Sequence, residues 1–339
     1  MNIKRILAFV IVLFLMVGNA KALKIVSLGD SIPNGYLLSD SKDSFDDMFA
    51  RNLNADFYEY SYLGMRSDDL LFDLEEESLK NKIQQADIII INIGANDLLD
   101  LLDYADLSKV GIQIEYGNIP TVDLNSESIK NLKTYLQEFV TVELKPLSDK
   151  SIEDFSIVFP SIIDQIKEYN SNAMIIVNNL YNPFFSISVP LLGVDLSDIE
   201  KETDRIINGY NEIINKYGGY KIIDVYSALR DNKYLNVSPL SLSFDPHPNI
   251  EGHKKIYELY LQELCYKVTY DNKEYYVLKN GKANIKPKYK FGYTFIKWDQ
   301  DIDNVKSDIV LKAVYKLNYI YIIIPILVAI AILIVKKKH

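Results

Sequence analysis

The side chains that could carry out hydrolytic chemistry in this 339-residue chain begin with the serine at position 31. Residues 24–35, KIVSLGDSIPNG, contain a short β-branched and aliphatic run that ends in Gly29, Asp30 and Ser31. Such a run predicts a buried strand, and the turn after it places the serine hydroxyl at the carboxyl edge of a sheet, where open α/β sheets bind ligands. Because Asp and Ser are also common in turns and helix caps, Ser31 needs partners before it indicates a nucleophile.

A serine is a weak nucleophile at neutral pH unless a base accepts its proton, and histidine has a suitable pKa for this task. The chain has three histidines, and His339 lies beyond a long apolar segment at the C-terminus. His247 lies between two prolines in residues 243–249, which we interpret as a rigid loop before a helix at 250–264. His253 lies inside that helix, so we favour His247 as the base.

Two other turns carry groups that could stabilise an oxyanion. Gly64 ends a predicted strand at 56–63, and Asn96 follows a very hydrophobic strand predicted at 86–94. If these strands neighbour the first one, the backbone amides of Ser31 and Gly64 and the side-chain amide of Asn96 point into one cleft. Donors placed in this way stabilise the tetrahedral intermediate of acyl transfer.

The elements that must position these groups alternate between strands and helices. The predicted strands cover 24–28, 56–63, 86–94, 173–178 and 220–225, and the predicted helices cover 44–53, 67–83, 160–169, 198–216 and 250–264. This alternation predicts an α/β fold, a three-layer α/β/α sandwich around a five-stranded parallel sheet. We interpret the irregular residues 98–159 as an insertion and a candidate lid.

Four blocks of this chain together resemble the signature of the SGNH hydrolases, also called the GDSL esterase/lipase family. The blocks are Gly29-Asp30-Ser31, Gly64, Gly94-x-Asn96-Asp97 and His247-Pro-Asn, in this order within residues 23–264. The resemblance implies a flavodoxin-like sandwich with Ser31 as nucleophile, His247 as general base and acid, and an oxyanion hole from Ser31, Gly64 and Asn96. Asp30 and Asp97 are expected to brace their turns, and the reaction needs no metal or organic cofactor.

The acid that would orient His247 departs from the family pattern. The family carries it three residues before the histidine, where this chain has Phe244, whereas Asp245 lies two residues before. Either Asp245 reaches the imidazole because Pro246 bends the chain, or a backbone carbonyl near Phe244 orients the ring. We favour Asp245.

Both ends of the chain favour export and membrane anchoring. Residues 1–22 combine a basic start, an apolar run and an Ala-Lys-Ala site, as is typical of a signal peptide. Residues 317–335 are almost entirely apolar, enough for a transmembrane helix, and the basic tail 336–339 favours a cytoplasmic C-terminus. Cys265 is the only cysteine, so the chain forms no internal disulfide. We therefore expect a single-pass cell-membrane protein of Gram-positive bacterial type with an extracellular catalytic domain.

We interpret residues 265–316 as a separate β-rich module, because short alternating segments and turn dipeptides replace the helical pattern there. Residues 292–316 resemble the Listeria–Bacteroides repeat of internalin B-like surface proteins, with Gly-Tyr-x-Phe, Trp-Asp and Ala-x-Tyr in order. The resemblance implies a small β-grasp-like fold. The module is either a spacer or the binding site of a cell-wall or surface ligand.

The overall charge excludes nucleic acid as a partner. The formal net charge is −9, and without the six basic residues of the two ends 31 basic residues stand against 46 acidic ones. An acidic surface repels nucleic acid and anionic lipid, and we identify no basic patch that compensates. The sequence therefore predicts an ester hydrolase acting through an acyl-enzyme on lipid esters such as lysophospholipids or on O-acetylated glycans.

Two other functions stay open at this point. One is an inactive hydrolase that serves as a surface adhesion protein through residues 265–316, although the joint presence of Ser31, Asn96 and His247 argues against it. The other is a metallohydrolase using Asp245, His247 and His253, but their spacing matches no metal-binding motif.

Overall fold

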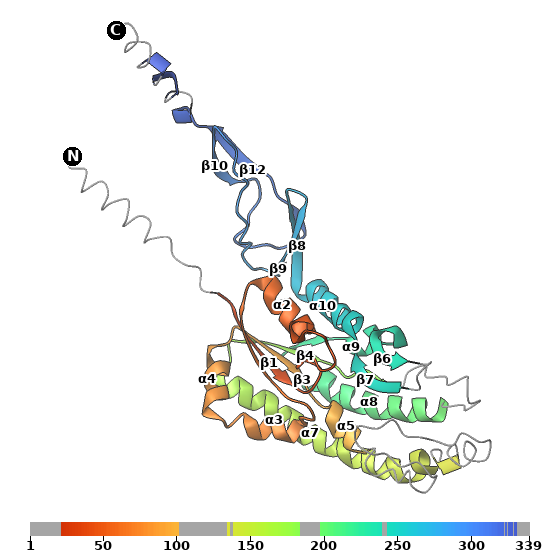
Figure 1. Cartoon of the computed structure of the whole chain (residues 1–339). Coiled ribbons are helices and arrows are strands. Elements are labelled where there is room, and N and C mark those ends of the chain that lie inside the picture. Colours follow the sequence, from red (N-terminus) through yellow and green to blue (C-terminus); the bar gives the residue numbers. More distant parts are fainter. Residues whose placement is uncertain are drawn as a thin grey trace.

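A computed structural model of the chain shows an α/β body followed by a β module (Figure 1). The structure describes residues 22–101, 134–135, 138–183, 197–238, 243–321, 323, 325–327 and 329–330. The predicted signal peptide, apart from Ala22, lies outside the described residues, and so do residues 102–133 and 136–137 of the candidate lid.

The body is built on one parallel sheet of five strands. The strands are β1 (Lys24–Gly29), β2 (Asp56–Ser61), β3 (Ile88–Asn92), β4 (Met174–Asn178) and β5 (Lys221–Ile223), in the order β2-β1-β3-β4-β5. This confirms the predicted sheet. Gly29 at the end of β1 lies opposite Ser61 of β2 and Asn92 of β3, so the turns that follow these three strands begin at the same edge of the sheet.

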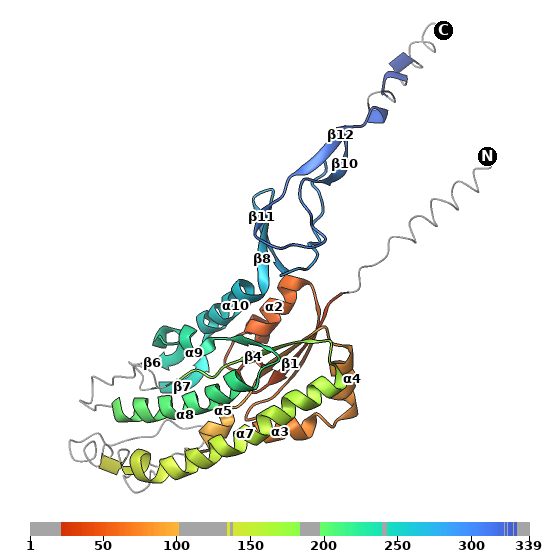
Figure 2. The same ribbon diagram turned by 180° about the vertical axis from the view of Figure 1, so that it is seen from behind.

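Helices cover both faces of the sheet, as Figures 1 and 2 show. One face carries α2 (Phe45–Leu53), α9 (Val225–Ala228) and α10 (Ile250–Leu264), and the other carries α3 (Ser67–Asp73), α4 (Glu77–Gln85), α5 (Ala95–Leu99), α7 (Leu144–Tyr169) and α8 (Ser197–Tyr217). Alternate residues of each central strand enter different cores: Ile88 and Ile90 pack toward α2 and α10, whereas Ile89 and Ile91 pack toward α7 and α8. Because helices cover both faces of the sheet, side chains on both sides of β3 are buried, and this explains why β3 is apolar at consecutive positions.

Two predicted helix boundaries were wrong. The helix predicted at 67–83 is two helices, α3 and α4, separated by residues 74–76. The helix predicted to begin at Pro160 begins at Leu144, after a π-helical turn at Phe139–Glu143. Proline inside a helix removes a backbone hydrogen bond, but here buried Phe155, Phe159, Ile162, Ile163 and Ile166 form a continuous apolar stripe on both sides of it. Tertiary packing therefore stabilises the helix through the proline, and residues 144–159 of the candidate lid belong to a helix that packs into the core.

The β module begins directly where α10 ends. Its strands are β8 (Cys265–Tyr270), β9 (Lys273–Leu278), β10 (Tyr293–Trp298), β11 (Ile309–Val310) and β12 (Ala313–Leu317). They form a sheet in the order β11-β8-β9 and a separate β10-β12 ribbon, with Val268, Ile285 and Leu311 in a small core. The strands agree with a β-rich module, and its likeness to a β-grasp-like surface repeat stays a prediction.

Beyond β12, the described residues contain no helix that is both long enough and apolar enough to cross a membrane. Residues 322, 324, 328 and 331–335 of the predicted span lie outside the described residues. The membrane span therefore stays a prediction from the sequence.

A buried carboxyl group under β1 makes the stability of the body depend on pH. Asp46 of α2 is fully buried and accepts a 2.5 Å hydrogen bond from Ser27 Oγ. Burial raises the pKa of Asp46 from 3.8 to about 7, against the lowering effect of that hydrogen bond. The folded protein thus keeps a proton that the unfolded chain loses at lower pH.

We therefore expect the free energy of unfolding to fall as pH rises from about 4 to about 7. Asp46→Asn, which keeps the shape of the neutral acid, should make this fall smaller, as measured by urea unfolding at pH 5 and pH 8. Asp43→Asn on the exposed surface is the control and should leave the pH dependence as in the wild type. An equal fall in wild type and Asp46→Asn would contradict the prediction.

Candidate active site

Ser31 is held at the sheet edge by a close approach of β1 to β3. A Cβ atom at Gly29 would lie 2.2 Å from the backbone oxygen of Asn92, so only glycine fits at this position. The following residue, Asp30, is buried, and its Oδ1 accepts hydrogen bonds from the backbone N–H of Ile32 at 3.0 Å and from Asn92 Nδ2 at 3.3 Å. This places Ser31, which is 7% exposed, at the wall of a cavity.

A chain of buried polar groups runs from Asp30 into the body. Asn92 Oδ1 accepts a 3.0 Å hydrogen bond from Asn178 Nδ2 of β4, and Asn178 Oδ1 accepts a 2.8 Å bond from the Tyr260 hydroxyl of α10. Burial raises the pKa of Asp30 to about 7, although its hydrogen bonds and the charge of His247 lower it. The chain connects the ends of β1, β3 and β4, so the position of Ser31 is tied to the packing of α10.

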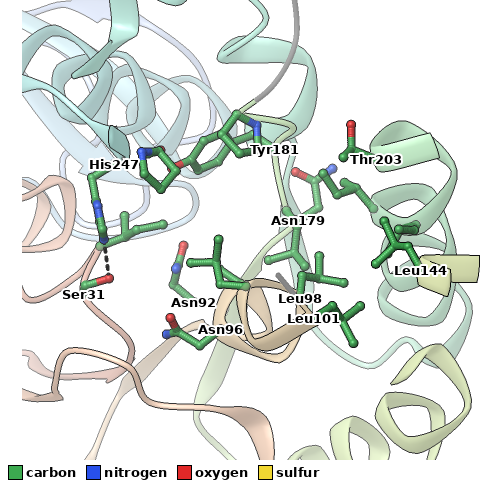
Figure 3. Close-up of a pocket in the computed structure, with 18 residues that line it drawn as sticks. Ser31, Asn92, Asn96, Leu98, Leu101, Leu144, Asn179, Tyr181, Thr203 and His247 are labelled. Carbon is green, nitrogen blue, oxygen red and sulfur yellow. Dashed lines mark hydrogen bonds between the residues drawn. The ribbon is translucent and has the colours of Figure 1, made fainter. Parts of the chain in front are cut away.

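His247 lies 216 residues after Ser31 in the sequence, and the fold brings the two side chains together. Its ring Nε2 lies 2.7 Å from Ser31 Oγ (Figure 3). The predicted loop around it was wrong: residues 243–248 form strand β7, which pairs with β6 (Leu235–Ser238) in an antiparallel hairpin. The register of this pair shifts between Asp245 and Pro248, so His247 lies at an irregularity of the hairpin between two paired residues.

Asp245 is the partner that orients the imidazole. Its Oδ1 lies 2.5 Å from His247 Nδ1 and also accepts the backbone N–H of His247 at 2.9 Å. Burial raises the pKa of Asp245, but the hydrogen bonds and the charge of His247 outweigh it and hold the pKa below its ordinary value. Of the two alternatives left open by the sequence, the structure thus shows the Asp245 contact, because Pro246 turns the carboxylate back toward the ring.

Three residues that the sequence did not indicate hold the His247 segment in place. The Tyr181 hydroxyl donates a 2.5 Å hydrogen bond to the carbonyl of Pro246, and Asn236 Nδ2 donates to the carbonyl of His247 at 3.1 Å. The ring of Tyr36 lies edge-on to the imidazole, with 4.8 Å between the ring centroids. The single sequence signal for any of them is that Tyr181 follows the end of β4.

Of the three predicted oxyanion donors, Ser31 and Asn96 line the cavity and Gly64 does not. Asn96, in the first turn of α5, lines the same cavity as Ser31, and its Nδ2 donates a 2.9 Å hydrogen bond to the carbonyl of Met65. The second hydrogen of this amide is still available to a ligand. Gly64, next to Met65, has a φ of 81° and is exposed, but it is not among the residues that line the cavity. The structure therefore brings Ser31 and Asn96 together and leaves Gly64 at the adjacent turn.

The remaining histidine and aspartate of the predicted blocks have structural contacts. His253 is fully buried, and its Nδ1 accepts the backbone N–H of Phe45 at 3.3 Å. Burial lowers the pKa of His253 to about 4, so the ring is neutral at physiological pH. Asp97 accepts the backbone N–H of Ser67 at 3.0 Å and braces the start of α3. Among the described residues, no group of three His, Cys, Asp or Glu side chains is placed to hold a metal ion.

The cavity beside Ser31 and His247 is lined mainly by apolar side chains of α5, α7 and α8 (Figure 3). These side chains include Leu98, Leu144, Ile206 and Ile207, and Leu101, which follows α5, also lines the cavity. Polar groups lie at its end near Ser31, where Asn92 and Asn96 contribute amides, and on one side, where Asn179 contributes an amide and Thr203 a hydroxyl. The arrangement offers a nucleophile with its base at one end of an apolar slot.

We expect Tyr181→Phe to lower kcat about tenfold on a short ester with little change in KM, because it leaves the Pro246 carbonyl unpaired but keeps the ring in the cavity wall. The pH dependence of kcat/KM should shift with it, which general destabilisation would not cause. The matched control is Tyr220→Phe, because the Tyr220 hydroxyl also donates to a backbone carbonyl, that of Ile214, away from the cavity. A wild-type kcat in Tyr181→Phe would exclude a positioning role for this hydroxyl.

Comparisons with known proteins find similar sequences and structures. The curated relatives include the uncharacterized protein YpmR of Bacillus subtilis, 24% identical over 255 residues, which are 70% of this chain and 82% of YpmR. They also include the spore germination lipase LipC of Bacillus licheniformis, 22% identical over 248 residues, covering 70% of this chain and 93% of LipC. Among solved structures, phospholipase A1 from Streptomyces albidoflavus aligns at 17% identity with a TM-score of 0.46, over 72% of this chain and 99% of that one.

The profile of the GDSL-like Lipase/Acylhydrolase family matches residues 27–255. The matched region is more than half of the chain, and it contains Ser31, Asn96, Asp245 and His247. The chain therefore belongs to the GDSL-like lipase and acylhydrolase family.

Proposed function

We propose that this lipase-family enzyme is an extracellular serine hydrolase of lipid esters, such as lysophospholipids, and that it works through an acyl-enzyme on Ser31. The observation that carries the proposal is the line of contacts from Ser31 Oγ to His247 Nε2 at 2.7 Å and from His247 Nδ1 to Asp245 at 2.5 Å. This is the geometry that a serine needs in order to lose its proton as it attacks.

In the first half of the reaction, Ser31 Oγ attacks the acyl carbon while His247 Nε2 takes the hydroxyl proton. The ionised Asp245 stabilises the imidazolium that forms, and the Ser31 backbone N–H and Asn96 Nδ2 donate to the oxyanion, with the Gly64 amide as the third donor if its turn closes on the substrate. When the intermediate collapses, the imidazolium gives its proton to the leaving alcohol. The acyl group is then bonded to Ser31.

In the second half, a water molecule attacks the acyl carbon and gives a proton to His247. The second tetrahedral intermediate collapses, the carbon–Oγ bond breaks, and His247 returns the proton to Ser31. The carboxylic acid leaves, and no group of the protein is changed over the cycle.

The apolar cavity favours a lipid ester over an O-acetylated glycan. An acetyl group would fill only the end of the slot near Ser31, whereas a longer acyl chain would contact Leu98, Leu144 and Ile206. Each buried methylene is worth about 0.8 kcal/mol of transfer free energy, so the slot selects for chain length. The name of LipC, a lipase, supports the same substrate class.

The location of the enzyme is proposed from the sequence pattern at its two ends. Residues 1–22 have the composition of a signal peptide, and residues 317–335 have the length and apolarity of a membrane span followed by a basic tail. We place the catalytic body on the outer side of the cell membrane, anchored by its C-terminal segment.

The second candidate function is a surface adhesion protein whose body no longer hydrolyses esters. The contacts among Ser31, His247 and Asp245 argue against it, since adhesion gives no reason for them. A fluorophosphonate probe separates the two functions, because it labels only an activated serine. A folded protein that stays unlabelled would favour adhesion.

Ser31→Ala and His247→Ala should each reduce hydrolysis of short-chain nitrophenyl esters to the background rate and abolish fluorophosphonate labelling, because each removes one partner of the proton transfer. Asp245→Ala should lower kcat by about 10³ to 10⁴ while the protein stays folded, as judged by circular dichroism. His253→Gln tests the alternative base and should retain most activity where the variant folds. Undiminished hydrolysis by Ser31→Ala would disprove the acyl-enzyme.

A bulky side chain in the slot should shorten the preferred acyl chain. Leu98→Trp is expected to lower the ratio of kcat/KM for octanoyl over acetyl ester by at least about tenfold, because several methylenes lose their contacts. Val142→Trp is the matched control, since Val142 is 63% exposed and does not line the cavity. An unchanged ratio in Leu98→Trp would mean that the acyl chain binds elsewhere.

A further inference from the structure

The end of the β module that lies farthest from the catalytic sheet is basic and aromatic. Residues 286–293 contain three lysines and no acidic residue, and residues 265–317 as a whole carry 11 lysines against six acidic residues. The module is therefore locally positive in an otherwise acidic protein. The interpretation from the sequence that no basic patch compensates the acidic charge was wrong for this module.

Aromatic side chains are exposed on the same segment. Tyr289 is 72% exposed and Phe291 is 73% exposed, and both precede β10. Tyr319 and Tyr321, just after β12, are 62% and 39% exposed. Large aromatic side chains in water are unfavourable unless a partner covers them, so this cluster indicates an interaction surface.

Specific contacts hold these residues together at one end of the β10-β12 ribbon. The backbone N–H of Asn318 donates to the carbonyl of Gly292 at 2.8 Å, and the rings of Phe291 and Tyr321 meet edge to face with 5.4 Å between centroids. Figures 1 and 2 both place this end of the ribbon away from the α/β body, next to the C-terminal residues. We call residues 286–293 with Tyr319 and Tyr321 the basic aromatic surface.

The lysines around this surface are largely free to meet an outside partner. Lys288 forms an ion pair with Asp271 at 3.0 Å. Among the described residues, Lys286 and Lys290 have no carboxylate within ion-pair distance, and both are exposed. Lys290 Nζ instead lies 4.2 Å from the centroid of the Tyr293 ring, so its charge stays beside the aromatic cluster.

We propose that the basic aromatic surface docks onto the headgroup layer of an anionic phospholipid bilayer. Aromatic side chains are favoured at the boundary between headgroups and acyl chains, and lysines next to an anionic leaflet are attracted to it. The exposed Ile320 and Ile323 belong to the proposed membrane span at 317–335, so this surface lies where that span would meet the headgroup layer. A soluble polyanion would pair with the lysines but would leave Tyr289 and Phe291 in water.

Docking through this surface would set the orientation of the catalytic body relative to the membrane, which a C-terminal anchor alone does not do. A flexible attachment at the C-terminus leaves the orientation of the module free. Docking through both the aromatic rings and the lysines makes the orientation depend on the charge of the lipid and on salt. Docking is independent of the proposed ester hydrolysis, because the two involve different residues.

The test uses the full chain with a polarity-sensitive fluorophore on Phe291→Cys. Cys265 is buried, and burial raises the pKa of its thiol to about 12, so the introduced cysteine is the reactive one. The labelled protein is placed on vesicles of phosphatidylcholine alone or mixed with phosphatidylglycerol. We expect a blue shift of the emission on the mixed vesicles, weakened by high salt, and no shift at Tyr217→Cys on the body, where the native tyrosine is 37% exposed.

The charge is tested with Lys286→Gln and Lys290→Gln combined. Each lysine near an anionic leaflet contributes roughly fivefold in binding, so the affinity for the mixed vesicles should fall about 25-fold. The matched control carries Lys42→Gln and Lys82→Gln on the body, with the same change in net charge, and should dock as the wild type does. Esterase activity on a soluble ester should be unchanged in both variants, which shows that they are folded.

Two results would overturn the proposal. One is an equal blue shift on both kinds of vesicle that the first lysine variant keeps, which would mean that the C-terminal segment alone sets the position of residue 291. The other is binding to inorganic polyphosphate in solution without a blue shift on any vesicle, which would assign the surface to a soluble or wall-bound polyanion instead.

Discussion

The position of Ser31, the proposed nucleophile, depends on how closely the ends of β1 and β3 approach each other. Gly29 leaves no room for a side chain against the backbone of Asn92, and the chain can turn there only because of it. The polar side chains at this turn are buried, and most of their polar atoms are paired. Asp30, Asn92, Asn178 and Tyr260 form a continuous chain of hydrogen bonds from the ends of β1, β3 and β4 to α10, while Oδ2 of Asp30 has no hydrogen-bond partner among the described residues. The packing of β1 against β3 therefore also fixes the position of Ser31.

His247, the proposed base, is held in place by different contacts. His247 is 216 residues from Ser31 in sequence, and it lies on a hairpin outside the main sheet. Its ring is fixed by Asp245, and its backbone is fixed by Tyr181 and Asn236, which come from other elements. The two halves of the site thus meet across the carboxyl edge of the sheet, where parallel α/β folds bring distant turns together.

The body and the β module differ in charge. The body carries most of the acidic residues and the apolar slot beside Ser31, while the module carries a cluster of lysines and exposed aromatic rings at its far end. A lipid ester as substrate and a lipid surface as docking partner suit each other, although each is proposed from different residues. The buried side chains of His253, which has a lowered pKa, and of Asp46, which has a raised pKa, belong to the core and contact neither the proposed substrate cavity nor the basic aromatic surface.

The sequence by itself predicted the five parallel strands and the family, and it singled out Ser31, Asn96 and His247, which the structure brings to one cavity, because these features depend on local patterns: apolar runs, glycine turns and short motifs. It missed the start of α7 at Leu144, the strand that carries His247 and the role of Tyr181. These were decided by tertiary structure, since the buried stripe of α7 outweighs Pro160 and the hydrogen bond of Tyr181 joins residues 65 positions apart. The same holds for Asp245, whose distance from His247 depends on the bend of the backbone at Pro246, which spacing in the sequence does not fix.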